Sequence, residues 1–236
     1  RMDLALTYLC QNGCPHCYVG RPKDFPEMST DDWKRVIDTC WEQGIPHLAF
    51  TGGEATLRPD LVELVQYAES VGQVTGLQTN GRRLRDRAYL DQLLLAGLDH
   101  IQITLESHDP AIHDRMSGSS GAWEETVAGI KAVVNADVYM MTNTTITTEN
   151  VDGIEETIAF AASLGVPTFG CNSLIYSGSG VCVGSGIPED QLQPILERVK
   201  DAAAAHQMRL IWYTPTQYCE FDPTGLELGI KGCTAA

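Results

Sequence analysis

Three cysteines, Cys10, Cys14 and Cys17, lie within eight residues near the start of the chain. Their x₃ and x₂ spacings let one loop turn all three sulfurs toward a single point. Converging thiolates bind soft metals, in zinc sites or in iron–sulfur clusters. Because three sulfurs leave one metal position open, the pattern favours a reactive centre. A structural zinc site with a distant fourth ligand, or unrelated buried thiols, are the alternatives.

A second polar motif, Gly52-Gly53-Glu54, comes directly after an apolar run that ends at Thr51. Glycines let a backbone approach a ligand closely, and a carboxylate accepts hydrogen bonds from an ammonium group. The motif therefore predicts a binding site for a cationic group. A plain turn with a solvent-facing glutamate is the alternative.

The elements that must position these motifs alternate between strands and helices. Strand-like runs occur at 3–9, 47–51, 73–78, 100–105, 138–146, 167–175 and 209–213, and helical patterns at 29–43, 59–70, 86–96, 109–116, 122–135, 151–164 and 188–207. A βα unit repeated six times predicts an α/β fold with parallel strands, as an open doubly wound sheet or a partly closed barrel. Ligand sites in such folds lie at the carboxyl ends of the strands, so one site can collect both motifs.

Bulk composition narrows the function classes. The net charge of −15 argues against a nucleic-acid partner, since phosphate binding needs clustered Lys and Arg. The sequence holds no apolar run long enough to span a bilayer and no export signal, so no membrane partner is expected. Eight cysteines without an export signal indicate metal ligation in a reducing compartment. We therefore expect a cytoplasmic enzyme.

Together, the cysteine motif, the Gly-Gly-Glu strand end and the βα alternation resemble the radical S-adenosylmethionine (radical SAM) enzymes over residues 3 to 213. The resemblance implies that residues 1–213 form a partial (β/α)₆ TIM-like barrel. It implies a 4Fe–4S cluster on Cys10, Cys14 and Cys17, with SAM at the open iron. An electron donor such as flavodoxin or ferredoxin would reduce the cluster, and cleavage of SAM would yield the radical that abstracts hydrogen from a substrate.

The resemblance also assigns cofactor contacts. Gly52, Gly53 and Glu54 would hold the methionine amine, and Thr104 and Glu106 the ribose hydroxyls and the methionyl portion. Further cofactor contacts are expected from Tyr18, Asn80, Arg115, Thr145 and Asn172. Each of these side chains also has an ordinary interpretation as a packing, turn, strand or surface residue. Cys182, in the Gly/Ser-rich loop 177–186, is the catalytic candidate, as a hydrogen donor or substrate-side thiol, against an inert loop cysteine.

The segment 214–236 holds two more cysteines, Cys219 and Cys233. It is similar to the start of a SPASM or twitch extension, which implies a short cysteine-containing extension with an auxiliary iron–sulfur cluster. A simple β-hairpin with incidental thiols is the alternative. The predicted function is a radical SAM oxidoreductase or maturase acting on a peptide or protein side chain. The alternatives are modification of a tetrapyrrole or another small cofactor precursor, and a non-catalytic zinc or iron–sulfur binding module.

Overall fold

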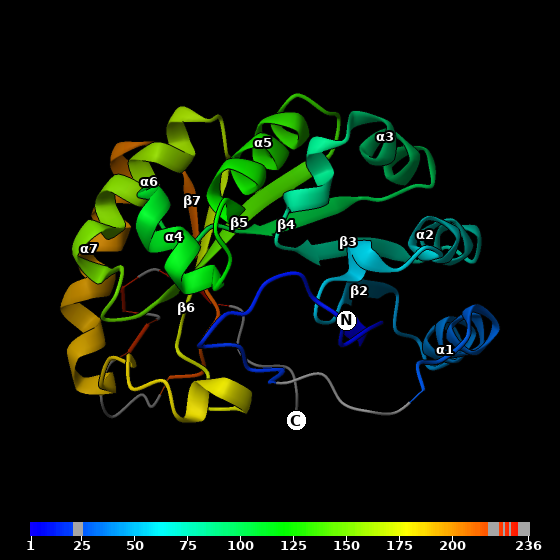
Figure 1. Ribbon diagram of the computed structural model, residues 1–236, viewed down its shortest axis with the longest axis horizontal. Helices are drawn as coiled ribbons and strands as arrows, with labels where there is room; N and C mark the ends of the chain where they lie inside the picture. The colour runs from blue at the N-terminus through cyan, green and yellow to red at the C-terminus, as the bar shows by residue number, and fades with distance from the viewer. Residues whose placement is uncertain (21–25, 217–221, 224, 227, 231–236) are drawn as a thin grey trace. The chain divides into compact units, whose positions relative to one another are not determined.

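The computed structural model describes residues 1–20, 26–216, 222, 223, 225, 226 and 228–230, the last two by their backbone alone. The chain divides into two compact units. The first unit comprises Arg1–Asn12, Val19–Ile103 and Glu125–Met140, and the second Gly13–Tyr18, Thr104–Glu124 and Met141–Ala236. Each unit alternates strands with helices (Figure 1).

In the first unit the strands pair in parallel, in the order β1-β2-β3-β4. Helices α1 and α2 pack beside each other (Figure 1). The elements are β1 (Met2–Ala5), α1 (Thr30–Glu42), β2 (His47–Thr51), the 3₁₀ turn η1 (Ala55–Leu57), α2 (Leu61–Ser70), β3 (Val74–Thr79), η2 (Arg82–Arg85), α3 (Arg87–Leu95) and β4 (His100–Thr104), whose last residue belongs to the second unit.

The second unit repeats this arrangement with parallel strands in the order β5-β6-β7-β8. Helices α6 and α7 pack against each other. The elements are α4 (Pro110–Ser117), α5 (Ala122–Val134) and β5 (Tyr139–Ile146), of which the last two contribute residues to both units, then η3 (Val151–Gly153), α6 (Ile154–Ser163), β6 (Thr168–Ser173), η4 (Gly178–Val181), η5 (Glu189–Gln191), α7 (Leu192–Ala205), β7 (Arg209–Trp212) and β8 (Gly229–Ile230).

Local sequence explains where α1 begins. The Ser29 hydroxyl accepts from the Asp32 backbone N–H at 3.2 Å, and the Asp32 carboxylate accepts from the Ser29 N–H at 3.1 Å. This reciprocal capping box pairs backbone donors that the first turn cannot pair internally. Trp33 and Ile37, four residues apart, then lie on one face of the helix and are buried.

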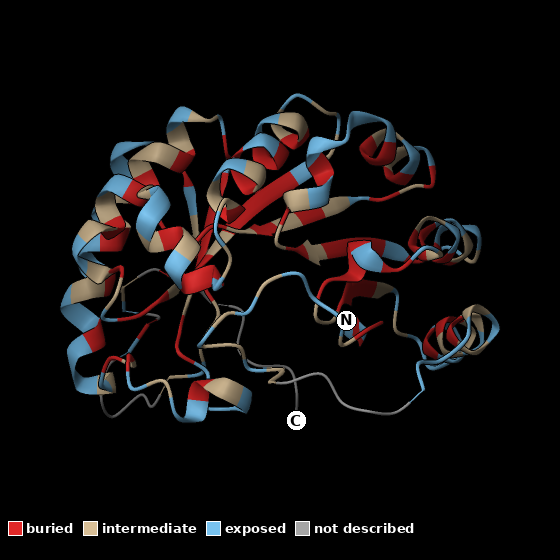
Figure 2. Ribbon diagram, in the orientation of Figure 1, coloured by how far each residue is buried: buried red, intermediate tan, exposed pale blue. Residues whose placement is uncertain are grey.

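Buried apolar and partly exposed polar side chains alternate along β4 and at the end of β3. Phe50, Leu77 and Ile101 lie opposite one another on β2, β3 and β4 and are buried. The next pair along β3 and β4, Gln78 and Gln102, is partly exposed. Figure 2 shows the same contrast across the helices, each of which buries one face and exposes the other. On β4 and at the end of β3, the apolar side chains therefore lie in the core, and Gln78 and Gln102 lie on the opposite face of the sheet.

The predicted α/β elements are confirmed in order and type, with differences at their ends. The run 3–9 forms a strand only to Ala5, because the backbone of Thr7 and Leu9 bonds Gly53 and Glu54 instead of extending the ladder. The helix expected over 188–207 begins as η5 and becomes α-helical at Leu192. The short strand β8, which pairs with β7, was not anticipated.

Candidate functional site

The cysteine stretch is divided between the two units. Cys10 is exposed in the first unit, and Cys14 and Cys17 are partly exposed in the second. No disulfide joins any of the three to another described residue. Within the described ranges, no three side chains of His, Cys, Asp or Glu are grouped so that they could hold a metal ion.

In the first unit, the backbone that leads into Cys10 packs closely against Gly52 and Gly53. The Gly53 N–H bonds the Thr7 carbonyl at 2.7 Å, and the Glu54 N–H bonds the Leu9 carbonyl at 2.8 Å. Gly52 has a φ of +143°, and a Cβ there would lie 2.3 Å from the Thr7 carbonyl oxygen. A Cβ on Gly53 would lie 2.4 Å from the Leu9 carbonyl oxygen. The close approach expected of these glycines is thus made by the chain itself, and their contact with a ligand stays a prediction.

The Glu54 carboxylate is 1% exposed and fully bonded on one oxygen. Oε1 accepts from the Thr56 N–H at 3.0 Å, the Thr56 hydroxyl at 2.6 Å and the Thr79 hydroxyl at 2.7 Å. Oε2 accepts from the Asn80 N–H at 2.8 Å. A carboxylate offers about four acceptor positions, so Glu54 is close to saturated. It binds the end of β2 to the end of β3.

Asn80 connects this carboxylate to the first cysteine. Its side-chain amide Nδ2 lies 4.0 Å from the Cys10 sulfur, and the Asn12 N–H donates to the same sulfur at 3.4 Å. The Asn80 Oδ1 accepts from the Gln11 side chain at 3.3 Å and from the Arg82 N–H at 3.1 Å. N–H donors directed at sulfur favour the thiolate, which is the form that ligates iron. On this observation, Cys10 fits a cluster ligand.

In the second unit, backbone groups hold the remainder of the cysteine stretch. The Gly13 N–H and the Cys14 thiol both donate to the Ser117 carbonyl, at 2.9 and 3.6 Å. The Cys17 carbonyl accepts from the Ser179 N–H at 2.9 Å. The Gly/Ser-rich loop therefore contacts the cysteine stretch through its backbone, while Cys182 itself is exposed.

Glu106 is the second buried carboxylate, also 1% exposed. Its Oε2 accepts from the Thr145 N–H at 2.9 Å, and its Oε1 lies 3.1 Å from Nε2 of His16. Burial opposes the charged imidazole, but the adjacent Glu106 carboxylate outweighs this effect and raises the pKa of His16 above its usual value. The structure thus places Glu106 against the cysteine stretch. Its predicted cofactor contact stays a prediction.

Thr145 and Asn172 lie opposite each other on β5 and β6. The Asn172 Nδ2 donates to the Thr145 hydroxyl at 3.4 Å and to the Ser173 carbonyl at 2.8 Å. The Asn143 Nδ2 donates to the Asn172 Oδ1 at 2.8 Å. The two predicted cofactor contacts, Thr145 and Asn172, therefore lie together with Asn143. Their hydroxyl and amide groups can form hydrogen bonds with a polar ligand.

The other predicted residues differ in setting. Arg115 on α4 is largely exposed and bonds Glu149 at 2.8 Å. Thr104 is partly exposed at the end of β4, and the Tyr18 side chain is exposed. Cys219 and Cys233 lie outside the described residues. The roles expected of these residues stay predictions.

Two side chains that sequence reasoning did not select are Gln78 and Gln102. They lie opposite each other on β3 and β4, partly exposed. In the described part of the chain, neither side chain makes a hydrogen bond or ion pair. His100, Gln102 and Thr104 are polar at every second position of β4, and this alternation could have identified Gln102, because such residues share one face of the sheet.

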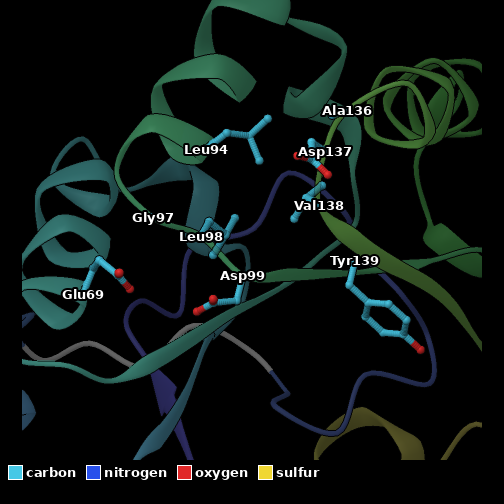
Figure 3. A pocket seen from close by; sticks show the side chains of 9 residues that line it. All are labelled: Glu69, Leu94, Gly97, Leu98, Asp99, Ala136, Asp137, Val138 and Tyr139. Carbon is cyan, nitrogen blue, oxygen red and sulfur yellow. The ribbon is translucent and has the colours of Figure 1, made fainter.

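An open pocket in the first unit is not part of this constellation (Figure 3). Its lining includes Glu69, Asp99 and Tyr139, at the end of α2 and the starts of β4 and β5. The Asp99 carboxylate accepts from the Thr75 N–H at 2.7 Å, which gives it a structural role. Ligand sites of parallel α/β folds lie at the opposite, carboxyl ends of strands.

No helix in the described ranges is both long and apolar enough to cross a membrane.

Comparisons with known proteins agree with this geometry. Residues 4–161 match the family model described as the radical SAM superfamily. The chain is 32% identical over 177 residues to the AdoMet-dependent heme synthase of Methanosarcina barkeri, covering 74% of this chain and 50% of that protein. The chain therefore spans half the length of this curated relative.

Two solved structures share the fold at low identity. The structure of Streptococcus suis SuiB bound to precursor peptide SuiA is similar with a TM-score of 0.80 and 16% identity, covering 91% of this chain and 48% of that chain. The structure of anSMEcpe with bound AdoMet and Kp18Cys peptide is similar with a TM-score of 0.73 and 13% identity, covering 89% and 62%. The fold of this chain is thus the α/β partial barrel predicted from the sequence.

Proposed function

The chain belongs to the radical SAM superfamily, a superfamily of enzymes, and from that premise we propose that it forms the catalytic core of an enzyme that cleaves SAM reductively. Cys10, Cys14 and Cys17 would hold the 4Fe–4S cluster. When bound and reduced, this cluster supplies the electron that converts SAM to methionine and the 5′-deoxyadenosyl radical, which abstracts hydrogen from the substrate. The protein's own contribution would be to bind and orient SAM and the substrate, and to exclude water from the site.

The observation that carries the proposal is the chain of contacts from Glu54 to Cys10. Glu54 accepts the Asn80 N–H, and the Asn80 side chain approaches the Cys10 sulfur. Asn80 thereby links the Gly-Gly-Glu turn to Cys10, the proposed cluster ligand. A site that binds both SAM and the cluster would require the two to lie close together. Because Glu54 is buried, we propose that the partly exposed peptides at Gly52 and Gly53 meet the methionine amine. Glu54 holds that turn and contributes negative charge nearby.

The remaining cofactor contacts are proposed for the polar cluster on β5 and β6. Thr145 and Asn172 offer hydroxyl and amide groups suited to the adenosine portion of SAM. Thr104, Arg115, Tyr18 and Glu106 keep the roles that the resemblance implies, and Cys182 that of a hydrogen donor. An auxiliary cluster on Cys219 and Cys233, an electron donor such as flavodoxin or ferredoxin, and a cytoplasmic location complete the proposal.

For the substrate there are two candidates. A peptide or protein side chain is supported by SuiB and anSMEcpe, whose structures contain peptides, although their likeness to this chain concerns the fold alone. A tetrapyrrole is supported by the heme synthase, which shares far more sequence with this chain. The higher sequence identity favours the tetrapyrrole. The non-catalytic zinc module has no support of this kind.

Anaerobic reconstitution tests the proposed chemistry. The wild-type protein should take up iron and sulfide, and after reduction it should release 5′-deoxyadenosine from SAM. Cys14→Ala should abolish both, with Cys40→Ala as the matched control, because Cys40 is buried on α1 away from the motif. Zinc uptake without iron would overturn the proposal. Faster release with a tetrapyrrole than with a peptide library would decide between the substrates.

A further inference from the structure

The contact between His16 and Glu106 is not required by any role assigned so far. His16 lies between Cys14 and Cys17, and its side chain is 11% exposed, against 2% for that of Glu106. Their atoms Nε2 and Oε1 are 3.1 Å apart. Burying two polar side chains costs free energy unless they bond each other well, so the pair acts as a specific link.

Glu106 is held on every side that the described residues show. Its Oε2 accepts from the Thr145 N–H at 2.9 Å. Its own N–H donates to Nδ1 of His113 at 3.2 Å, and its carbonyl accepts from the Asn150 side chain at 2.8 Å. A side chain fixed at both its carboxylate and its backbone is a rigid anchor for whatever bonds the remaining oxygen. That partner is His16.

The neighbouring contacts of the cysteine stretch depend mainly on backbone groups. Gly13 is bonded to Ser117, and Cys17 to Ser179, through peptide groups, and the Cys14 thiol donates to the Ser117 carbonyl. The His16–Glu106 contact joins two side chains, and it falls within the turn between Cys14 and Cys17. Substitution can therefore remove it without altering the main-chain bonds on either side.

We infer that His16 is a positioning residue that fixes the turn carrying Cys14 and Cys17 by bonding Glu106. The inference rests on the proposed function, because it matters only if these thiols bind a cluster. It gives Glu106 a second role, as an anchor for the cysteine stretch, beside the cofactor contact proposed above. Partners of this kind around metal ligands typically alter metal affinity ten- to a hundredfold when removed.

The test compares two polar variants that differ in reach. Gln has an amide nitrogen at about the distance of the histidine Nε2, whereas the Asn amide is one bond shorter. His16→Asn should release iron to a chelator about tenfold faster than wild type. His16→Gln should stay close to wild type, and His16→Asn combined with Glu106→Gln should be no faster than His16→Asn alone. The electron paramagnetic resonance spectrum of the reduced cluster should change in His16→Asn and be restored in His16→Gln.

His108→Asn is the matched control, because His108 bonds Thr157 at 3.2 Å and lies outside the cysteine stretch. Its iron release should equal that of wild type. Wild-type rates and spectra in His16→Asn would overturn the inference while leaving the proposed function intact. Failure of the wild-type protein itself to bind iron would instead overturn the proposed function.

Discussion

The two units each place a buried carboxylate at a strand end, but they use it differently. In the first unit, Glu54 follows β2 and bonds the N–H of Asn80 after β3. In the second, Glu106 follows β4 and bonds the N–H of Thr145 on β5. The remaining oxygen of Glu54 is filled by threonine hydroxyls and an amide, whereas that of Glu106 meets the imidazole of His16.

This difference shows two ways of supporting the loop that is proposed to bind the cluster. Cys10 is supported indirectly, since Glu54 orders the turn from which Asn80 approaches the sulfur. The Cys14–Cys17 turn is supported directly, by a side chain within it. The first arrangement depends on dense packing of backbone and hydroxyl groups, and the second on a single removable pair. Substitutions should therefore be more damaging in the first unit.

Gly52→Ala should have the largest effect. The new Cβ would lie 2.3 Å from the Thr7 carbonyl oxygen, and the φ of +143° disfavours any side chain. We expect a loss of about 4 kcal/mol in the free energy of unfolding, from overpacking and backbone strain together. Gly44→Ala is the control, with a φ of +73° and no atom within 4 Å of its Cβ, and should lose only about 1 kcal/mol. Urea denaturation measures both, and equal losses would contradict the close approach.

Glu54→Gln and Glu106→Gln test the two buried carboxylates directly against each other. In Glu54→Gln, with the amide oxygen on the three donors of Oε1, the NH₂ group would face the Asn80 N–H and leave two donors opposed, costing about 2 kcal/mol. In Glu106→Gln, the new amide can accept the Thr145 N–H and donate to a neutral His16, so the loss should stay below about 1 kcal/mol. Thermal unfolding of the two variants measures the difference. A larger loss in Glu106→Gln would reverse the comparison.

Asp60→Asn tests the contacts that hold the chain before the cysteine stretch in the first unit. Asp60 bonds Arg58, which also bonds the carbonyl of Leu6, a residue that precedes Cys10 in the chain. Burial alone would raise the pKa of Asp60, but the bonds from Arg58 and Thr30 lower it below 3.8. A lowered folded-state pKa stabilises the protein above pH 3.8, and that stabilisation is lost as the pH falls through the lowered value. The variant should lose about 1.5 kcal/mol at pH 7, and this loss should shrink as the pH falls through the lowered pKa of Asp60. Denaturation over a series of pH values below 7 checks this, and a pH-independent loss would contradict it.

Glu155→Gln gives the smallest expected effect and sharpens the comparison from the second unit. Glu155 pairs with Arg198 at 2.6 Å on the surface, where both side chains are well exposed. Exposed pairs contribute little because water and salt screen them, so the loss should stay below about 0.5 kcal/mol and shrink in high salt. Chemical denaturation at low and high salt measures it. A loss as large as that of Asp60→Asn would show that exposure does not separate the two pairs.

Much of this protein could be predicted from the sequence because its signals are local. The capping box at Ser29 and Asp32 requires residues three apart, and the strand β2 was predicted at 47–51 and observed there. The cysteine spacing likewise lies within one loop, which is why the family was identified before any contact was known. Gln78 and Gln102 could not be predicted as a pair, because the register that places them opposite each other is set only in the folded sheet.

By itself, the sequence determined the order of strands and helices, the family, and the residue types that carry its chemistry. The tertiary structure alone decided that Asn80 lies against Cys10, 70 positions away, and that Glu106 reaches His16 across 90. It also decided that Gly52 and Gly53 accommodate the chain's own backbone. The physical reason is that local propensity acts over a few residues, whereas hydrogen-bond partners at strand ends are chosen by the register of parallel strands that are distant in sequence.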